Sequence, residues 1–336
     1  MIPRRRLLSA TAALASLLAP AATARAQSGD LGTELVDALE GVFGAHPGAR
    51  RAHAKGRLYD GRFTPAEAAA RLSRAPQFAG AGPTPLVLRF SDGSGLPDVA
   101  DNTPEAVPPG IALRFLTPDG RPNDILANAN EGFPVRTGED FVAFLRSIAA
   151  SGPGTPAPTP LQRFVAAHPE TQRFLARPHP TAASFAATRY FGNNALVFVA
   201  ADGRRRAFRY VIEPASGDVE ILTPEQARGR SPSFLFEDLD RQLASGGPVR
   251  LALIAQLAAP GDPTNDATML WPAERERVTL GTIEVTGVHA DQAEERRLFF
   301  DPNNLPSEGI TQSDDPLLPV RGQAYGVSIA RRTKSD

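Results

Sequence analysis

The stretch Arg50-Arg51-Ala52-His53-Ala54-Lys55-Gly56 holds a histidine between two small side chains. Ala52 and Ala54 leave room for a large, flat group to lie against the imidazole. Arg50, three residues upstream of the histidine, can reach an anionic group at the edge of such a ligand. A lone histidine beside basic residues is more often an ordinary loop residue than a catalyst. The rest of the chain must therefore decide between the two interpretations.

The first 26 residues carry the features of an export signal. A basic start, Arg4-Arg5-Arg6, precedes an apolar run over 7–18, and Ala24-Arg25-Ala26 resembles a cleavage site. The apolar run is too short to span a membrane as a helix. The paired arginines fit a twin-arginine signal, and the alternative is an ordinary secretory signal with a basic start. We therefore expect a signal peptide over 1–26 and a periplasmic or otherwise exported mature chain, 27–336, that forms a single domain without a membrane span.

Composition limits the partners of the mature chain. Removing residues 1–26 removes four Arg and no acidic residue, so the formal charge changes from −1 to −5. A mildly acidic chain is a poor ligand for nucleic acid or for an anionic membrane surface, and we expect neither as a partner. The sequence has no Cys, which excludes thiolate ligation of a metal or of heme iron. No spacing of its His residues predicts a histidine metal site.

Alternating apolar residues predict strands, and longer periodic stretches predict helices between them. The predicted strands are 85–91, 110–117, 124–127, 195–200, 207–212, 219–222, 249–257 and 277–288. The predicted helices are 31–44, 65–75 with a capping box over 64–67, 137–150, 234–243 and 315–332. About eight strands in antiparallel hairpins, with helices in the connections, predict an α+β fold built on a closed eight-stranded barrel.

A second candidate site lies in the last predicted helix. Arg321 and Tyr325 are four residues apart, so their side chains share a helix face and can touch. A guanidinium beside a phenol favours the phenolate, and a ferric iron would favour it further. Phenolate ligation is one of the known ways to hold heme iron. The alternative is simple stacking of Arg on Tyr at the surface of a helix.

Several segments, taken in order, resemble the heme catalases. The stretch 50–56 is similar to the family's distal-histidine segment, and 300–305, 315–318 and 321–325 are similar to its proximal segment. Between them, 87–91, 124–128, Asp262-Pro263-Thr264 and Trp271-Pro272 match in the same order. Any one of these motifs is weak, but together they cover roughly residues 45–332. The resemblance implies a catalase-like barrel with surrounding helices and a heme b cofactor.

The resemblance also implies roles for single residues. Tyr325 would be the iron ligand, with Arg321 beside it. His53 would be the distal acid–base catalyst, hydrogen-bonded to Ser91 and assisted by Asn128. The remaining implied heme contacts are three arginines for the propionates and two aromatic side chains over and beside the ring: Arg50, Arg89, Arg332, Phe133 and Phe141.

Departures from the family pattern bear on the activity. The chain lacks the long N-terminal arm and the C-terminal helical region of full catalases, and Ala52 and Val107 stand where the family has Val and Asp. These changes fit the short catalase-related peroxidases, which implies reduction of hydrogen peroxide, or of organic peroxides, by a small-molecule electron donor. The alternatives are a small true catalase, a heme hydroperoxide isomerase and a non-catalytic heme-binding barrel. Without the arm, we expect a monomer or a small homo-oligomer.

Overall fold

The computed structural model describes residues 20–80 and 82–334. Most of the predicted signal peptide, residues 1–19, lies outside the described residues. Over 20–26 the backbone is helical and belongs to the first helix, α1 (Pro20–Phe43). The signal peptide and its cleavage site therefore stay predictions.

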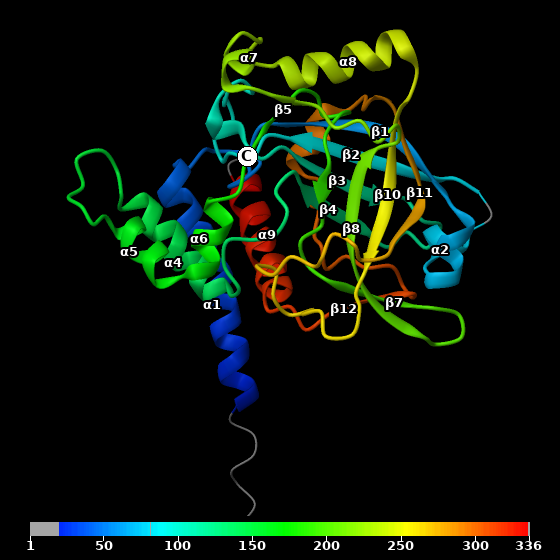
Figure 1. Cartoon of the computed structure of the whole chain (residues 1–336), viewed down its shortest axis with the longest axis horizontal. Helices are drawn as coiled ribbons and strands as arrows, with labels where there is room; N and C mark the ends of the chain where they lie inside the picture. Colours follow the sequence, from blue (N-terminus) through cyan, green and yellow to red (C-terminus); the bar gives the residue numbers. More distant parts are fainter. Residues whose placement is uncertain (1–19, 81, 335–336) are drawn as a thin grey trace, which may run out of the picture.

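A closed barrel of eight antiparallel strands forms the centre of the molecule (Figure 1). Neighbouring strands follow the order β10, β11, β1, β2, β3, β4, β6, β8, and pairing of β8 with β10 closes the ring. The eight strands are β1 (Gly56–Pro65), β2 (Thr84–Ser91), β3 (Gly110–Phe115), β4 (Asp124–Asn128), β6 (Tyr190–Phe191), β8 (Arg205–Pro214), β10 (Val249–Leu257) and β11 (Arg277–Val288). The predicted α+β barrel with surrounding helices is confirmed.

The membership of the barrel differs from the prediction at two strands. The sequence pattern missed β1, because a bulge between Asp60 and Gly61 breaks its alternation, and it missed β6, which has only two residues. Two predicted strands lie outside the ring. Of these, β7 (Leu196–Val199) pairs with β8 and with β12 (Ile310–Gln312), whereas β9 (Ile221–Leu222) pairs with β5 (Thr181–Ala182) in a separate sheet.

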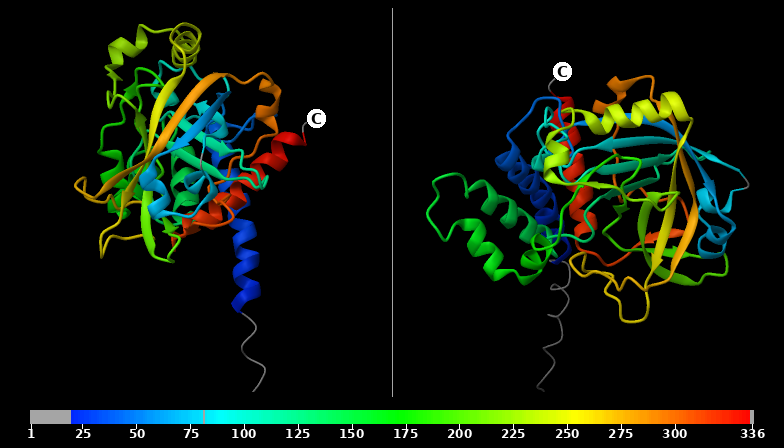
Figure 2. Two further views of the ribbon diagram at one scale, coloured as in Figure 1. Left: turned by 90° about the vertical axis from the view of Figure 1, so that its right-hand side faces the viewer. Right: turned by 45° about the horizontal axis from the view of Figure 1, so that its top comes forward.

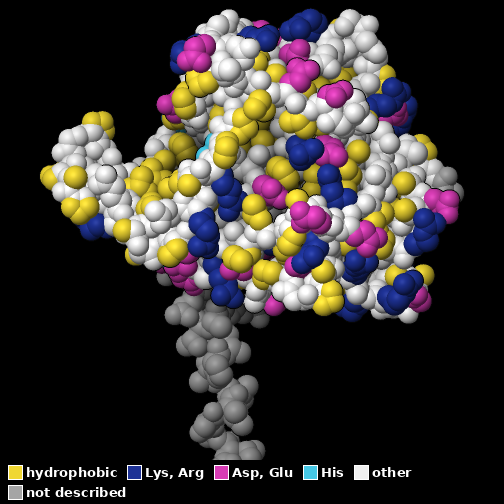
Figure 3. Space-filling model, in the orientation of Figure 1, with side chains coloured by type: hydrophobic (Ala, Val, Ile, Leu, Met, Phe, Trp, Pro, Cys, Tyr) yellow, Lys and Arg dark blue, Asp and Glu magenta, His cyan; other side chains and the backbone are white. Residues whose placement is uncertain are grey.

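Three helices, α1, α4 (Gly138–Ala149) and α9 (Leu317–Thr333), pack on one side of the barrel, with α9 between α1 and the strands (Figure 2). They share an apolar cluster that includes Val36, Val142 and Val320. Gly32 permits the close approach of α1 to α9, since a Cβ there would lie 2.6 Å from Cβ of Gln323. Figure 3 shows hydrophobic side chains gathered along the junction between the helical part and the barrel.

The other helices are short or lie at the edges of the barrel. They are α2 (Glu67–Leu72), α3 (Pro76–Ala79), α5 (Pro160–Ala167), α6 (Pro169–Leu175), α7 (Pro224–Arg228), α8 (Phe234–Gly246) and the 3-10 turns η1 (Pro104–Ala106) and η2 (Gln292–Arg296). The predicted capping box over 64–67 is wrong, because Thr64 and Pro65 are committed to the ladder of β1 with β11 and α2 begins only at Glu67. None of the described helices is long and apolar enough to cross a membrane.

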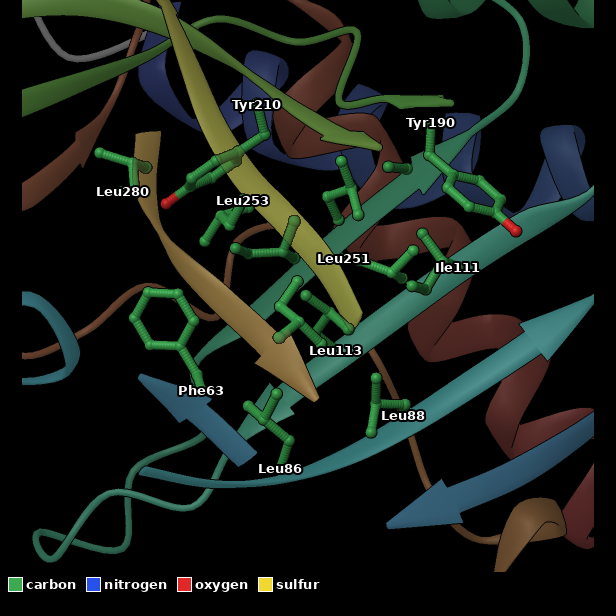
Figure 4. Packing of buried hydrophobic residues seen from close by; sticks show 14 of the residues in the cluster. Phe63, Leu86, Leu88, Ile111, Leu113, Tyr190, Tyr210, Leu251, Leu253 and Leu280 are labelled. Carbon is green, nitrogen blue, oxygen red and sulfur yellow. The ribbon is translucent and has the colours of Figure 1, made fainter. Parts of the chain in front are cut away.

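The two faces of β2 divide the barrel core from the outer surface. Leu86 and Leu88 point into the barrel with other large apolar side chains (Figure 4), and burying this surface is the main source of its stability. Val87 instead packs outside the barrel against Phe300. Because side chains alternate along a strand, Arg89 shares the outer face with Val87. The chemistry-bearing side chains of β2 therefore lie between the barrel and the helices.

Candidate active site

A cavity lies between the outer face of the barrel and helices α1, α4 and α9. Its empty volume is about 1440 Å³, which includes space that opens to solvent. All ten residues that the sequence singled out line it: Arg50, His53, Arg89, Ser91, Asn128, Phe133, Phe141, Arg321, Tyr325 and Arg332. The structure thus brings together segments that are up to 282 positions apart, Arg50 and Arg332.

Strand register places the distal residues in one row. Ser91 on β2 pairs with Gly110 on β3, and Gly110 pairs with Asn128 on β4. Nδ1 of His53 lies 3.1 Å from Oγ of Ser91, within hydrogen-bonding distance. The absent side chain of Gly110 makes room for the imidazole, because a Cβ there would lie 2.8 Å from Cε1 of His53.

His53 lies in a loop and has an uncommon backbone conformation. His53 has φ 53°, in the left-handed region that few residues other than glycine adopt. Its neighbour Ala54 donates its backbone N–H to the carbonyl of Ser94 at 2.8 Å, and Arg89 donates to the carbonyl of His53 at 2.8 Å. Such strained backbone conformations are kept where contacts with the surrounding structure fix them, and they are frequent at functional sites.

Burial and nearby charge keep His53 neutral. Burial of the imidazole, together with the positive charge of Arg89, lowers the pKa of His53 to about 4. Arg321 and Arg50 act in the same direction, and a hydrogen bond from the imidazole to the backbone carbonyl of Asp92 partly opposes them. At neutral pH the ring is therefore free to accept a proton. When Nδ1 donates to Ser91, the base is Nε2.

Asn128 is oriented by its own loop. Its Oδ1 accepts a hydrogen bond from the backbone N–H of Asn130 at 2.9 Å. This contact fixes the amide so that Nδ2 is the group left to donate to a ligand in the cavity. His53 and Asn128 thus supply a proton acceptor and a hydrogen-bond donor to the same space.

Tyr325 and Arg321 form the other wall from α9. Nη2 of Arg321 donates to the phenolic oxygen of Tyr325 at 3.0 Å. Nη1 of Arg321 donates to Oδ1 of Asn194, whose Nδ2 donates to Asp315 at 2.8 Å. Asp315 also accepts the backbone N–H of Leu317, so the chain of contacts is anchored at the start of the helix.

Three arginines meet at another edge of the cavity. Arg50 and Arg89 both donate through Nε to one carboxylate oxygen of Glu295, at 2.8 and 2.7 Å. Arg332 donates to the backbone carbonyl of Arg296 at 2.7 Å. The three guanidinium groups come from a loop, a strand and a helix, and they meet only in the folded protein.

Aromatic and aliphatic side chains form the flat walls. The rings of Phe133 and Phe141 lie edge to face with centroids 4.8 Å apart. Leu35 and Val36 of α1 line the cavity beside them. An apolar slot with a phenol on one wall and arginines at an edge fits a heme, whose ring is apolar and whose two propionates are anionic.

Sequence reasoning assigned no role to three residues that position these groups. Asn194 and Asp315 hold Arg321, and Glu295 holds two of the arginines. Glu295 lies in a run of charged residues, Glu294 to Arg297, which reads as a solvated surface. The feature that could have indicated its role is the need of distant buried arginines for an acidic partner, and a linear sequence does not show which residues come together.

Comparison with known proteins identifies the family. A family model described as Catalase matches residues 45–335. The chain is 36% identical over 307 residues to a catalase-related peroxidase of Mycolicibacterium paratuberculosis, covering 90% of this chain and 95% of that protein. It is 31% identical over 330 residues to a catalase-related peroxidase of Synechococcus elongatus, covering 96% and 95%. The chain therefore belongs to the catalase family.

Larger members of the family share the fold. A bacterial catalase structure superposes with a TM-score of 0.72 at 23% identity, over 84% of this chain and 57% of that one. A fungal catalase structure gives a TM-score of 0.73 at 18% identity, over 98% of this chain and 66% of that one. The chain thus spans about three fifths of the length of these solved catalases. Family membership implies a heme cofactor, and the residues of the cavity fit one.

Proposed function

We propose that this protein is a peroxidase with heme b as its cofactor, and that it reduces hydrogen peroxide, or organic peroxides, with a small-molecule electron donor. Membership of the catalase family makes the chain an oxidoreductase that acts on peroxide. The observation that carries the proposal is the row formed by Ser91, Gly110 and Asn128, which seats the neutral imidazole of His53 in the cavity that Tyr325 also lines. A passive heme carrier has no need of this row.

The distal residues have separate tasks in this proposal. His53 accepts the proton of the peroxide oxygen nearer to the iron site. It returns this proton to the other oxygen, which leaves as water. Nδ2 of Asn128 donates a hydrogen bond that orients the peroxide. Ser91 fixes the plane of the imidazole. When bound, the heme would supply the two electrons for cleavage of the O–O bond, and the electron donor would restore them.

The proximal residues would hold the cofactor. The phenolic oxygen of Tyr325 would ligate the iron, and Arg321 donates a hydrogen bond to this oxygen at 3.0 Å. Arg50, Arg89 and Arg332 would bind the propionates, for which arginine is well suited. Phe133 and Phe141 would pack against the ring.

We favour a peroxidase over a true catalase because of Ala52. Ala52 lines the cavity next to His53, and its small side chain takes up less of the space before the imidazole than the Val that the family pattern has there. The test is to measure donor oxidation and oxygen evolution on the same heme-loaded sample. Peroxide-dependent oxidation of a phenolic or diamine donor, with little oxygen release, supports the proposal. Rapid oxygen evolution without a donor would make the protein a small catalase.

We further propose that the protein is exported, with a signal peptide over 1–26 of the twin-arginine type. The support is the order of basic start, apolar run and Ala24-Arg25-Ala26 in the sequence. Replacing Arg4 and Arg5 together by Lys should retain the protein inside the cell. Unchanged export of that double variant would indicate the general secretory route.

A further inference from the structure

Among the described residues, Glu295 is the acidic residue that pairs with Arg50 and Arg89, two of the arginines expected to bind the propionates. It lies on η2, and its Oε1 accepts from Nε of Arg50 at 2.8 Å and from Nε of Arg89 at 2.7 Å. The side chain is 18% exposed, and the side chains of Arg50 and Arg89 are 12% and 4% exposed. The arginines line the cavity and Glu295 does not. The carboxylate therefore binds the two guanidinium groups on their side away from the cavity.

The three guanidinium groups use their hydrogen-bond donors in the same way. In Arg50, Arg89 and Arg332, Nε and Nη2 donate to protein acceptors. Besides Oε1 of Glu295, the acceptors within 2.7 to 2.9 Å are the backbone carbonyls of His53, Glu295, Arg296 and Leu298. Among the described residues, Nη1 of each guanidinium has no hydrogen-bond partner. Three Nη1 groups, with two N–H donors each, are thus left for a ligand in the cavity.

The cluster is crowded with positive charge, and Glu295 offsets part of it. Burial and then the charge of Arg50 lower the pKa of Arg89 to about 10 and that of Arg332 to about 9, and Glu295 opposes both shifts. Burial would raise the pKa of Glu295, but Arg89 and Arg50 lower it to about 2. The carboxylate is therefore ionised at neutral pH. Three guanidinium groups and one carboxylate leave a net charge of +2.

The neighbouring basic residue does not change this balance. Arg51 also lines the cavity, but its Nε donates to Glu40 at 2.5 Å. Glu40 also pairs with Arg331, which pairs in turn with Asp37, so the charges of these four residues cancel. A net charge of +2 at one edge of an apolar slot matches a ligand that carries two carboxylates on one edge.

We propose that Glu295 is a positioning residue for the cofactor, holding Arg50 and Arg89 so that their free Nη1 groups meet the two carboxylates of the ligand. This inference rests on the proposed function, since it assumes that the ligand is heme. It adds a residue that contacts the arginines and not the ligand. It also predicts that this edge of the cavity prefers a ligand with two carboxylates. Glu295 acts without contacting the heme itself.

The test uses the heme-free protein and two probes, heme b and its dimethyl ester, in which both propionates are uncharged. Binding is followed by the absorption change at the heme band. The wild type should bind heme b more tightly than the ester. Glu295→Ala should weaken binding of heme b by roughly 10- to 100-fold, as loss of such outer contacts does at metal sites. Its affinity for the ester should stay close to that of the wild type.

Two further variants separate positioning from loss of structure. Glu295→Gln keeps an oxygen acceptor without the charge, and its affinity for heme b should fall between those of the wild type and Glu295→Ala. Glu294→Gln is the matched control, because Glu294 lies on the same turn but its side chain bonds to His289. The control should bind both probes as the wild type does. Melting temperatures of the heme-free variants show whether each is folded.

The outcomes are distinct. Equal weakening of both probes in Glu295→Ala would assign Glu295 a structural role only and overturn the inference. Tighter binding of heme b by Glu295→Ala would also overturn it, since the carboxylate would then compete with the propionates. Wild-type protein that binds heme b and its ester equally would overturn the selectivity for a dicarboxylate. Wild-type protein that binds neither would refute the proposed function together with the inference.

Discussion

Gly110 and His53 are so close that no side chain fits between them: a Cβ on Gly110 would lie 2.8 Å from Cε1 and 2.9 Å from Nδ1 of the imidazole. Gly110 lies in the middle of the row whose outer members are Ser91 and Asn128. The ring is therefore seated on the barrel wall, where a neighbouring strand supplies its hydrogen-bond partner. Because β3 is central in the sheet, its backbone cannot shift away from the ring at low cost.

Gly110→Ala should test this seat. The added methyl group forces the imidazole to move, and a misplacement of about 1 Å can cost about 100-fold in rate. We expect a loss of that order in the reaction with peroxide, with heme binding retained because Tyr325 and the arginines are untouched. Stopped-flow absorption measures the rate, and the heme spectrum measures loading.

The matched control for this variant is Gly287→Ala on β11. This position is also in a barrel strand, but a Cβ there meets nothing within 4 Å. It should react with peroxide at the wild-type rate. If Gly110→Ala reacted as fast as this control, the imidazole would not depend on the seat.

Tyr325→Phe should abolish or strongly weaken heme binding. The change removes the oxygen that accepts from Arg321 and leaves the ring, so the packing of α9 is preserved. We expect affinity to fall by more than about 100-fold, because even residues one contact further from a metal cost about 10- to 100-fold. Tyr210→Phe, in the barrel core, is the control and should bind heme normally. Retention of the wild-type heme band by Tyr325→Phe would refute the ligand assignment.

His53→Ala should separate catalysis from cofactor binding. Loss of a general acid–base group typically costs about 10²- to 10⁴-fold, so the second-order rate constant for peroxide should fall by at least that range. Heme content should stay close to the wild-type value, since the arginines and Tyr325 remain. Heme content and melting temperature must be measured on the same sample. A folded, heme-loaded variant with the wild-type rate would show that His53 is not the catalyst.

The barrel was predictable because its long strands alternate cleanly. Residues 277–288 were predicted as a strand, and β11 has those bounds. The barrel strand β1 was missed because Arg57, Asp60 and Arg62 interrupt its apolar residues, and because a bulge shifts the alternation of its side chains between the two faces. A linear pattern cannot show that a charged side chain of this kind has a partner, such as Glu284 for Arg62.

The site was predictable where a residue carries chemistry by its type and neighbours. His53, Tyr325 and the three arginines belong to motifs that remain readable in a linear sequence. Glu295 and Asn194 lie outside these motifs, and Asp315 lies in one that does not reveal its role, because each acts through a partner more than 100 positions away. Gly110 shows a further limit, since the need for a missing side chain appears only when the imidazole is placed.

The pH dependence of the peroxide reaction follows from the lowered pKa of His53. The imidazole must be neutral to accept a proton, and its pKa is about 4, lowered by burial and then by Arg89, Arg321 and Arg50. The rate constant should therefore be flat from neutral pH down to about pH 5 and fall only near pH 4. An unperturbed imidazole, with a pKa near 6.5, would already lose about tenfold at pH 5.5. Rapid mixing in buffers from pH 4 to 8 distinguishes the two.

The same shift should appear in stability, with a sign that can be checked. The unfolded imidazole binds a proton below about pH 6.5 and the folded one only below about pH 4, so the unfolded state binds more protons between these values. Stability that is present above pH 6.5 is therefore lost as the pH falls towards 4. His53→Ala should lose less melting temperature than the wild type between pH 7 and 5, both heme-free. Glu295 does not titrate in this window, because its pKa is about 2. Parallel losses in the two proteins would place the pKa of His53 near its ordinary value, and the imidazole would then be solvated in solution and not seated against Gly110.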